Sequence, residues 1–310
     1  MGQGKPAVDL SRYRIGLIGT GLMGAPMARR LAAAGARLAL WNRTIQTAER
    51  LAADLPNAEA VPSPRHAAER SDIVIVMVTD ADAVETVVFD PMDDSYGVAH
   101  GVGDGALVID MSTTDVARTQ GFADRLRARG AEWMDAPVSG GTTAAEDGTL
   151  SIMVGGSDGG FARAEPVFRA LGARITHVGA VGAGQIAKTA NQMIVGMTIG
   201  AVAEAFALAR SAGVEPRAIR EAILGGFAQS RILELHGERM VNEDFQVRAR
   251  STIQLKDMRA AASLAEAVGI DLPGLSTNLG LWERLVEEGA GDLDHSALIL
   301  TVDPTMTQDD

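Results

Sequence analysis

Lys188 is a candidate acid and base for catalysis. It lies in a mostly apolar segment, whereas lysines usually occupy solvated helix faces. On a helix, Asn191 and Gln192 share its face at i+3 and i+4. Gly184 lies one turn earlier, where the missing side chain is expected to leave room for a ligand. An ammonium there can donate a proton to a carbonyl oxygen as hydride arrives, and the neutral amine can take the hydroxyl proton in the reverse direction.

A second group, Ser139, Gly140 and Gly141, follows a strand-like segment that ends at Asp135. A hydroxyl followed by two glycines with exposed N–H groups can form an anion-binding nest, and a carboxylate would fit there. By itself the pattern is more typical of an ordinary turn between a strand and a loop, so both interpretations stay open at this point.

Residues 19–24 fit the G-x-G-x-x-G pattern, after a strand-like run and before an Ala-rich helical segment. The first glycine permits a tight turn, the second lets the backbone approach a pyrophosphate, and the third allows the helix to pack closely on the strand. The pyrophosphate would lie on the free N–H groups of the helix N-terminus. The predicted cofactor-binding residues are Gly19, Thr20, Gly21, Leu22, Met23 and Gly24.

The end of the next strand predicts which dinucleotide binds. An acidic residue there would bind both ribose hydroxyls of NAD, but this chain has Asn42, Arg43 and Thr44. An arginine with neighbouring hydroxyl and amide donors can hold a 2′-phosphate, which a carboxylate would repel. The sequence therefore favours NADP(H). NAD(H) is the alternative if Arg43 is only a solvated loop cation.

Alternating strand-like and helical segments up to residue 179 predict an α/β protein with a Rossmann-type doubly wound sheet. Beyond Gly179, amphipathic segments at about 183–212, 215–224, 230–241, 251–268 and 275–288 predict an all-α domain joined by a long helix. We expect a flexible leader at 1–13, an NADP-binding domain at 14–179, and a helical substrate and dimerisation domain at 180–310.

The composition excludes several classes of function. With 28 basic against 40 acidic residues, the net charge of -12 opposes nucleic-acid binding. The chain has no cysteine, and its five histidines show no metal-ligand spacing, so we expect no metal. The N-terminus has no apolar signal segment, so the cytoplasm is the expected location. The apolar stretch 193–209, interrupted by Glu204, predicts a buried helix rather than a membrane span.

Together the motifs resemble the β-hydroxyacid dehydrogenases, which include 3-hydroxyisobutyrate dehydrogenase. The resemblance covers about residues 14–300 and rests on five segments in order, 19–27, 110–113, 135–141, 182–192 and 256–257. Segments 135–141, 188–192 and 294–297 are most similar to the tartronate semialdehyde reductase branch. The resemblance implies an NADP(H)-dependent oxidoreductase that interconverts a short aldehyde acid and its β-hydroxy acid, such as tartronate semialdehyde and D-glycerate.

The resemblance also implies a role for each candidate residue. Lys188 would be the catalytic acid and base, Ser139 to Gly141 would hold the substrate carboxylate, and Asn191 or Gln192 would orient the substrate. Thr113 would lie at the nicotinamide end of the cofactor, and Lys256 would contact the cofactor from the helical domain. Val78 and Thr79 complete the expected cofactor contacts.

The chain departs from the family pattern at three positions. The amide four residues after the lysine is commonly Asn, but Gln192 holds that place here. Many members have an aromatic residue eight positions before Asp257, where this chain has Ala249, so we expect a larger substrate pocket. Arg43 resembles the NADP-using members, whereas several tartronate and hydroxyisobutyrate enzymes carry an acid there.

Several alternatives remain. Within the family, the substrate could be 3-hydroxyisobutyrate, glyoxylate, succinic semialdehyde or another hydroxy acid. Lys188 counts against an imine-reducing relative, and the chain length counts against a 6-phosphogluconate-type enzyme. A non-catalytic NADP(H)-binding sensor is disfavoured by Lys188 and Ser139. The long apolar helix predicts a homo-oligomer, a dimer or a tetramer, because it needs more covering than the small helices can give.

Overall fold

The computed structural model describes residues 8–90, 92, 95–303 and 305–306. The chain forms two compact units, Met1–Lys188 and Thr189–Asp310. Residues 1–7 of the expected leader lie outside the described residues, whereas Leu10 is fully buried in the core of the first unit and its N–H donates to the Ala34 carbonyl at 2.7 Å. The expected boundary at 179–180 coincides with the end of the last strand, and the helix that follows begins in the first unit.

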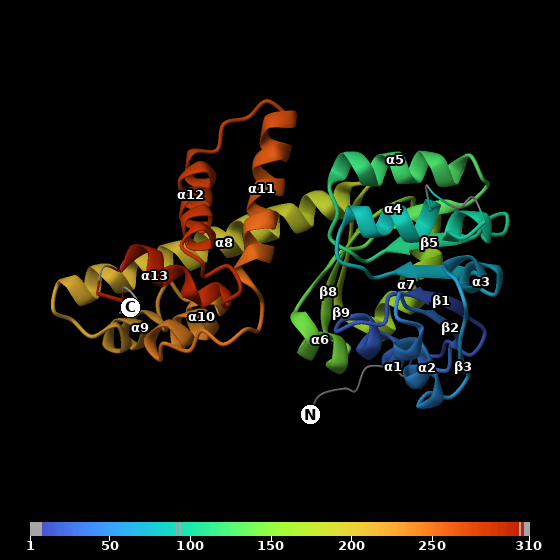
Figure 1. Cartoon of the computed structure of the whole chain (residues 1–310), viewed down its shortest axis with the longest axis horizontal. Coiled ribbons are helices and arrows are strands. Elements are labelled where there is room, and N and C mark those ends of the chain that lie inside the picture. Colours follow the sequence, from blue (N-terminus) through green and yellow to red (C-terminus); the bar gives the residue numbers. More distant parts are fainter. Residues whose placement is uncertain (1–7, 91, 93–94, 304, 307–310) are drawn as a thin grey trace. The chain divides into compact units, whose positions relative to one another are not determined.

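A mostly parallel sheet forms the centre of the first unit (Figure 1). The strand order is β3-β2-β1-β4-β5-β6-β8-β7, with β9 paired to β8. Strands β1 to β6 run parallel and are mostly buried on both faces, which explains their apolar runs. This is the order of a doubly wound sheet, so the predicted fold class is confirmed. The strands are β1 (Arg14–Ile18), β2 (Arg37–Trp41), β3 (Ala58–Ala60), β4 (Ile73–Val76), β5 (Leu107–Asp110), β6 (Glu132–Asp135), β7 (Val138–Ser139), β8 (Leu150–Gly155) and β9 (Gly172–Gly179).

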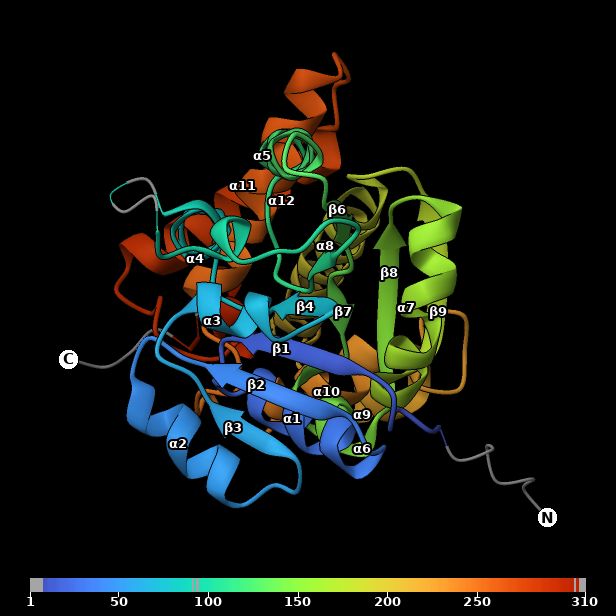
Figure 2. The same cartoon turned by 90° about the vertical axis from the view of Figure 1, so that its right-hand side faces the viewer.

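Helices cover both faces of this sheet (Figure 2). One apolar core, which includes Leu17 and Phe168, lies under four helices, and a second core, which includes Val76 and Trp133, lies under the helices of the other face. The first set is α1 (Gly24–Ala33), α2 (Ile45–Ala53), α6 (Gly141–Asp147) and α7 (Asp158–Leu171), and the second is α3 (Pro64–Glu69), α4 (Ala81–Phe89), η1 (Val98–His100) and α5 (Val116–Arg127). The carboxyl ends of the parallel strands meet at one edge, where ligands of such sheets bind.

The second unit is helical, as predicted. Its core includes Phe206 from the long helix α8 (Ala183–Ser211) and Trp282. Ser230 caps one helix by accepting a hydrogen bond from the Leu233 N–H at 3.0 Å, and Asp294 caps a short helix near the C-terminus. The other helices are α9 (Pro216–Ile223), α10 (Arg231–Val241), α11 (Ser251–Ala267), α12 (Pro273–Glu287), η2 (His295–Leu298) and α13 (Ile299–Val302).

Helix α8 is long and apolar enough to cross a membrane by length and composition alone, with a mean hydropathy of 1.6 over its most apolar window. Of that window, 44% is buried inside the protein. Core helices of soluble proteins pass the same test, so this property is weak evidence for a membrane span.

Candidate functional site

The glycine-rich loop leaves the carboxyl end of β1. Gly19 has a φ of +97°, and a Cβ atom there would collide with the carbonyl oxygen of Met77. A Cβ at Gly24 would collide with the carbonyl of Gly19, so the third glycine sets the close approach of α1 to the loop. No described atom lies within 4 Å of a Cβ built on Gly21. The three glycines therefore have the properties that the pattern predicts.

The start of α1 keeps backbone donors available for an anion. No side chain of the described residues caps this helix, and Leu22 in the loop is 85% exposed. Thr20 is buried, and its Oγ1 has no hydrogen-bond partner among the described residues. An uncapped helix N-terminus beside an unobstructed glycine is the arrangement that binds a pyrophosphate.

The turn after β2 is tied to the glycine-rich loop through Asn42. Its Oδ1 accepts a hydrogen bond from the Thr20 N–H at 3.1 Å, and its Nδ2 donates to the Thr44 carbonyl at 3.1 Å. Arg43 is exposed, and its guanidinium makes no hydrogen bond or ion pair within the described ranges. Thr44 is the N-cap residue of α2, but its side chain makes no capping bond. Arg43 and Thr44 therefore present donors that other described residues do not occupy.

The loops after β4 and β5 are joined to each other. The Val78 N–H donates to the Ser112 Oγ at 3.0 Å, and Thr113 follows, half-buried. Thr79 is exposed, and its hydroxyl donates to Asp80 at 3.1 Å, the residue that caps α4. Val78, Thr79 and Thr113 are thus brought to the same edge of the sheet as the glycine-rich loop.

A buried carboxylate, Asp135 at the end of β6, holds the first turn of α8. Its Oδ1 accepts a hydrogen bond from the Gly182 N–H at 2.7 Å, and its Oδ2 accepts one from the Gln185 N–H at 2.8 Å. The buried Gln185 side chain accepts from the Thr114 N–H at 3.1 Å and donates to the Ser112 carbonyl at 2.9 Å. We call Asp135, Gln185, Ser112 and Thr114 the Asp135 assembly. Sequence reasoning did not single out these residues as part of the site.

A second buried carboxylate, Asp110, lies beside Asp135 because the two are partners in the parallel register of β5 and β6. Burial raises the pKa of Asp110 to about 7, and hydrogen bonds from Ser112 and Thr114 oppose this shift. Burial likewise raises the pKa of Asp135, while the N–H donors of α8 lower it. The charge of Asp135 contributes to the raised pKa of Asp110, so the two carboxylates are electrostatically linked.

Lys188 lies one turn after Gln185 on α8 and is only 8% exposed. The expectation that Gly184 leaves room for a ligand is wrong. A Cβ at Gly184 would collide with the carbonyl oxygens of Met153 and Asp135, so backbone from the sheet fills that space. The glycine instead lets α8 approach β6 and β8 closely, which fixes the turn that carries Lys188.

Ser139 ends the short strand β7, and Gly140 and Gly141 follow with φ angles of +132° and +69°. Both glycines are exposed, and no described atom lies within 4 Å of a Cβ built on Gly141. Two successive positive φ angles turn the backbone N–H groups as only glycine does readily. The exposed glycines leave this stretch of backbone accessible, and its role in binding an anion stays a prediction.

Asn191, Gln192 and Lys256 belong to the second unit. The Asn191 Nδ2 donates to the Gln192 Oε1 at 2.8 Å, and the Gln192 Nε2 donates to the Asp257 Oδ2 at 2.6 Å. Lys256 is half-exposed and forms an ion pair with Asp257 at 3.6 Å. Ala249 is half-buried just before α11. The two candidate amides and the candidate lysine therefore belong to one network of hydrogen bonds and ion pairs centred on Asp257.

The predicted site residues thus divide between the two units. The first unit holds the glycine-rich loop, Arg43, Ser139 and Lys188, and the second holds the amides and Lys256. Within the part of the chain that the structure describes, no group of three or more His, Asp or Glu side chains is placed to hold a metal ion.

Known proteins match both halves of this chain. Residues 14–179 match the NAD binding domain of 6-phosphogluconate dehydrogenase. Residues 182–302 match the family described as NAD-binding of NADP-dependent 3-hydroxyisobutyrate dehydrogenase. The chain belongs to the β-hydroxyacid dehydrogenase family. The resemblance drawn from the motifs is therefore confirmed, and the protein is an NAD(P)-dependent oxidoreductase that acts on CH–OH donors.

Individual relatives cover nearly the whole chain. The chain is 41% identical over 288 residues to 2-hydroxy-3-oxopropionate reductase of Escherichia coli (strain K12), which covers 92% of this chain and 96% of that relative. A solved 3-hydroxyisobutyrate dehydrogenase from Salmonella typhimurium superposes with a TM-score of 0.80 at 32% identity, covering 93% of this chain and 99% of its own. The solved 3-hydroxyisobutyrate dehydrogenase of Mycobacterium tuberculosis, whose description includes L-serine, superposes with a TM-score of 0.84 at 29% identity. The match covers 94% of this chain and 99% of that one.

Proposed function

We propose that this β-hydroxyacid dehydrogenase uses NADP(H) and interconverts a short aldehyde acid and its β-hydroxy acid, with tartronate semialdehyde and D-glycerate as the favoured pair. The observation that carries the proposal is the buried Lys188, which follows by one turn the residue Gln185 that the Asp135 assembly holds, in the same unit as the glycine-rich loop. The 41% identity to 2-hydroxy-3-oxopropionate reductase supports the substrate pair.

The residues present fit a nicotinamide dinucleotide. Gly21 leaves the space beside the uncapped start of α1 unobstructed, as a pyrophosphate requires. Arg43 and Thr44 offer a guanidinium and a hydroxyl to a 2′-phosphate, and no described acid neutralises Arg43. When bound, the cofactor would supply or accept the hydride. The further cofactor contacts we propose are Asn42, Val78, Thr79, Thr113 and Lys256.

Lys188 moves the proton in this mechanism. In reduction its Nζ, as an ammonium, donates a proton to the carbonyl oxygen of the aldehyde, and in oxidation the neutral amine takes the proton of the hydroxyl. Its burial strengthens the interaction with negative charge developing on that oxygen, because little water screens it.

The substrate carboxylate is bound by the Ser139 hydroxyl and the N–H groups of Gly140 and Gly141. This contact fixes one end of the substrate, so that the reacting carbon is held at a set distance from the carboxylate. Asn191 and Gln192 are the residues we propose to orient the substrate. Of these two amides, Gln192 is held by Asp257, and Asn191 is held in turn by Gln192.

A substrate panel tests the proposal. Purified protein is assayed with D-glycerate, serine, 3-hydroxyisobutyrate, 4-hydroxybutyrate, sulfolactate, tartronate semialdehyde, glyoxylate and succinic semialdehyde, each with NADP(H) and with NAD(H). We expect the highest kcat/KM for the D-glycerate and tartronate semialdehyde pair with NADP(H). A higher value for 3-hydroxyisobutyrate or succinic semialdehyde would reassign the substrate within the family. If no compound of the panel is turned over, the result would favour a non-catalytic NADP(H)-binding sensor.

We also propose that the protein is a homo-oligomer. On α8, Ile194 is 61% exposed and Leu208 is 72% exposed, and such large apolar side chains on a long helix are typical of a covered face. Sedimentation equilibrium tests this proposal. A monomer at micromolar concentration would contradict it, and the measured mass would distinguish a dimer from a tetramer.

A further inference from the structure

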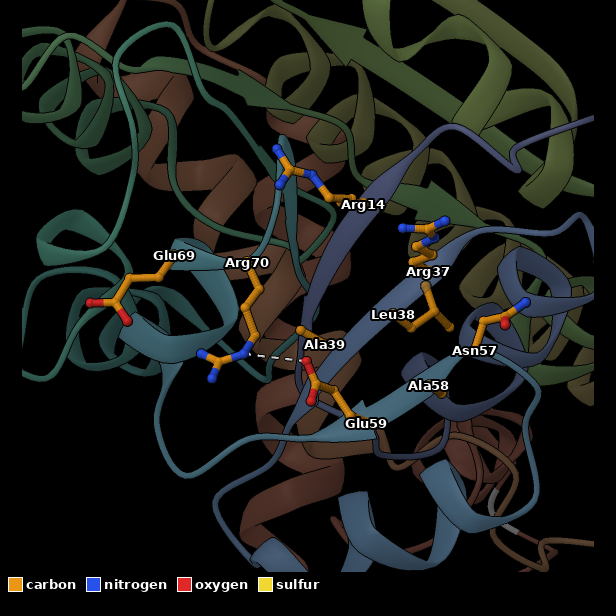
Figure 3. A pocket seen from close by; sticks show the side chains of 9 residues that line it. All are labelled: Arg14, Arg37, Leu38, Ala39, Asn57, Ala58, Glu59, Glu69 and Arg70. Carbon is orange, nitrogen blue, oxygen red and sulfur yellow. Dashed lines mark ion pairs between the residues drawn. The ribbon is translucent and has the colours of Figure 1, made fainter.

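The first unit has a depression on the side of the sheet that carries α3, at the amino ends of β1, β2 and β3 (Figure 3). It has a volume of about 520 Å³, within the range of small-molecule sites. Arg14, the first residue of β1, lies at its rim, whereas the glycine-rich loop follows the last residue of that strand. The two places are therefore about 16 Å apart along β1. The lining residues include Arg14, Arg37, Ala39, Glu59, Glu69 and Arg70.

Two arginines lie next to each other at this rim. Arg14 and Arg37 are register partners in the parallel pair of β1 and β2, so their side chains leave the same face of the sheet. Adjacent like charges destabilise a sheet unless they are compensated. Asp72 compensates Arg14 through two hydrogen bonds, at 2.5 Å and 3.0 Å, and Arg14 in turn lowers the pKa of Asp72. Arg37 is exposed and has no hydrogen bond or ion pair from its side chain among the described residues.

The other charged side chains of the lining each form an ion pair, Glu69 with a residue outside the lining. Glu69 is bound by Arg65 at 2.7 Å, one helical turn away. Arg70 is paired with Glu59 at 3.3 Å (Figure 3), but these two side chains are 45% and 61% exposed. An exposed pair of this kind contributes little and exchanges readily. Arg37 is therefore the uncompensated charge of the lining, whereas Arg70 is held by this exposed ion pair and by a hydrogen bond from its Nη1 to the His66 carbonyl oxygen at 3.1 Å.

We propose that this depression binds a small polyanion through its phosphate or carboxylate groups, with Arg37 as the main ligand and Arg70, released from Glu59, as the second. The planar guanidinium matches both kinds of oxyanion. Ala39, the next residue of β2 on the same face, has a side chain small enough to leave the floor of the depression clear (Figure 3). Because the site lies at the opposite end of β1 from the glycine-rich loop, this anion and the dinucleotide bind together without competing.

Isothermal titration calorimetry on the full chain tests this inference. Pyrophosphate and citrate are the two probes, titrated at constant ionic strength into protein saturated with its nicotinamide cofactor, so that the pyrophosphate site of the cofactor is filled. We expect saturable binding of at least one probe. Binding of pyrophosphate alone would identify phosphate as the recognised group, and binding of citrate alone would identify carboxylates.

Three exposed substitutions make the test specific. Arg37→Gln should weaken binding by roughly tenfold, the loss expected for one charge-assisted contact. Glu59→Gln should tighten binding, because it frees Arg70 and removes a negative charge. Arg29→Gln is the matched control, since Arg29 is an exposed arginine on α1 with no side-chain partner among the described residues, and it should change nothing. Unfolding temperatures without probe verify that each variant is folded.

Three outcomes would overturn the inference. The first is no saturable binding of either probe. The second is equal weakening in Arg37→Gln and Arg29→Gln, which would show a general effect of net charge. The third is binding in a parallel titration of cofactor-free protein that disappears on saturation with cofactor, which would place the probe in the dinucleotide site.

Discussion

Replacing Asp135 with asparagine should damage catalysis through the position of Lys188 rather than through any contact with substrate. The carboxylate accepts two hydrogen bonds from the first turn of α8, at 2.7 Å and 2.8 Å. Asparagine keeps one acceptor oxygen and turns an NH₂ group toward the other N–H. A charge-assisted hydrogen bond contributes about 1.5 to 3 kcal/mol, and the interaction with the helix dipole adds about 0.5 kcal/mol.

Removing a buried charge recovers part of that loss, because the carboxylate no longer has to be desolvated. We therefore expect the free energy of unfolding of Asp135→Asn to fall by about 2 kcal/mol. Lys188 lies one turn beyond the disturbed N–H groups, and a displacement of about 1 Å at a reacting group costs about 100-fold in rate. We expect kcat to fall by roughly 10 to 100-fold, with little change in the KM for NADPH.

Urea unfolding and steady-state kinetics measure the two effects separately. Ser157→Ala is the matched control, since Ser157 caps α7 by accepting a hydrogen bond from the Gly160 N–H at 2.9 Å. It should lose about 1 kcal/mol of stability and keep its kcat. A wild-type kcat in Asp135→Asn, or an equal fall of kcat in Ser157→Ala, would refute the reasoning.

Three further predictions follow from the site and from the helical unit. Lys188→Ala should lower kcat by about 10² to 10⁴-fold while cofactor binding, followed by fluorescence titration, stays unchanged; near-normal turnover would remove Lys188 from the mechanism. Arg43→Asp should lower kcat/KM with NADPH by about 10 to 100-fold and leave the value with NADH nearly unchanged, whereas a wild-type preference for NADH would contradict the role of Arg43. Burial lowers the pKa of His236 to about 4 and lowers that of His295 from its ordinary value of 6.5, so both are neutral in the folded protein. The contribution of these two neutral histidines to the free energy of unfolding is therefore complete above pH 6.5 and is lost as the pH falls toward 4. Urea unfolding should give a lower free energy of unfolding at pH 4.5 than at pH 7, and this difference should be smaller in His236→Phe.

Local patterns in the sequence predicted much of the fold and part of the site. The spacing of Gly19, Gly21 and Gly24 identified the loop because nearby backbone carbonyls exclude a side chain at Gly19 and Gly24, while Gly21 leaves the approach to the loop unobstructed. The long helices of the second unit were predicted within about two residues of their observed ends, because their apolar periodicity extends over many turns. The short strand β3 (Ala58–Ala60) has too few residues to show a pattern.

The Asp135 assembly was not predicted, because its bonds join segments far apart in the chain. Gln185 bonds to Ser112 and to Asp135, and no periodicity reveals such pairs. One signal was present, since Asp110 and Asp135 each end a segment that the alternation of strands and helices predicts as a strand. Gly184 was misinterpreted for a related reason: the role of a glycine depends on what faces it, and here that is the backbone of β6 and β8.

The scarcity of lysine makes the protonation of the buried Lys188 directly measurable. The sequence contains only three lysines, at positions 5, 188 and 256. Reductive methylation with ¹³C-formaldehyde would therefore give an NMR spectrum with signals from three side-chain amines and the N-terminus. Lys256 is half-exposed and serves as an internal reference beside the buried Lys188. The titration of Lys188 can thus be followed by spectroscopy without substituting any residue of the chain.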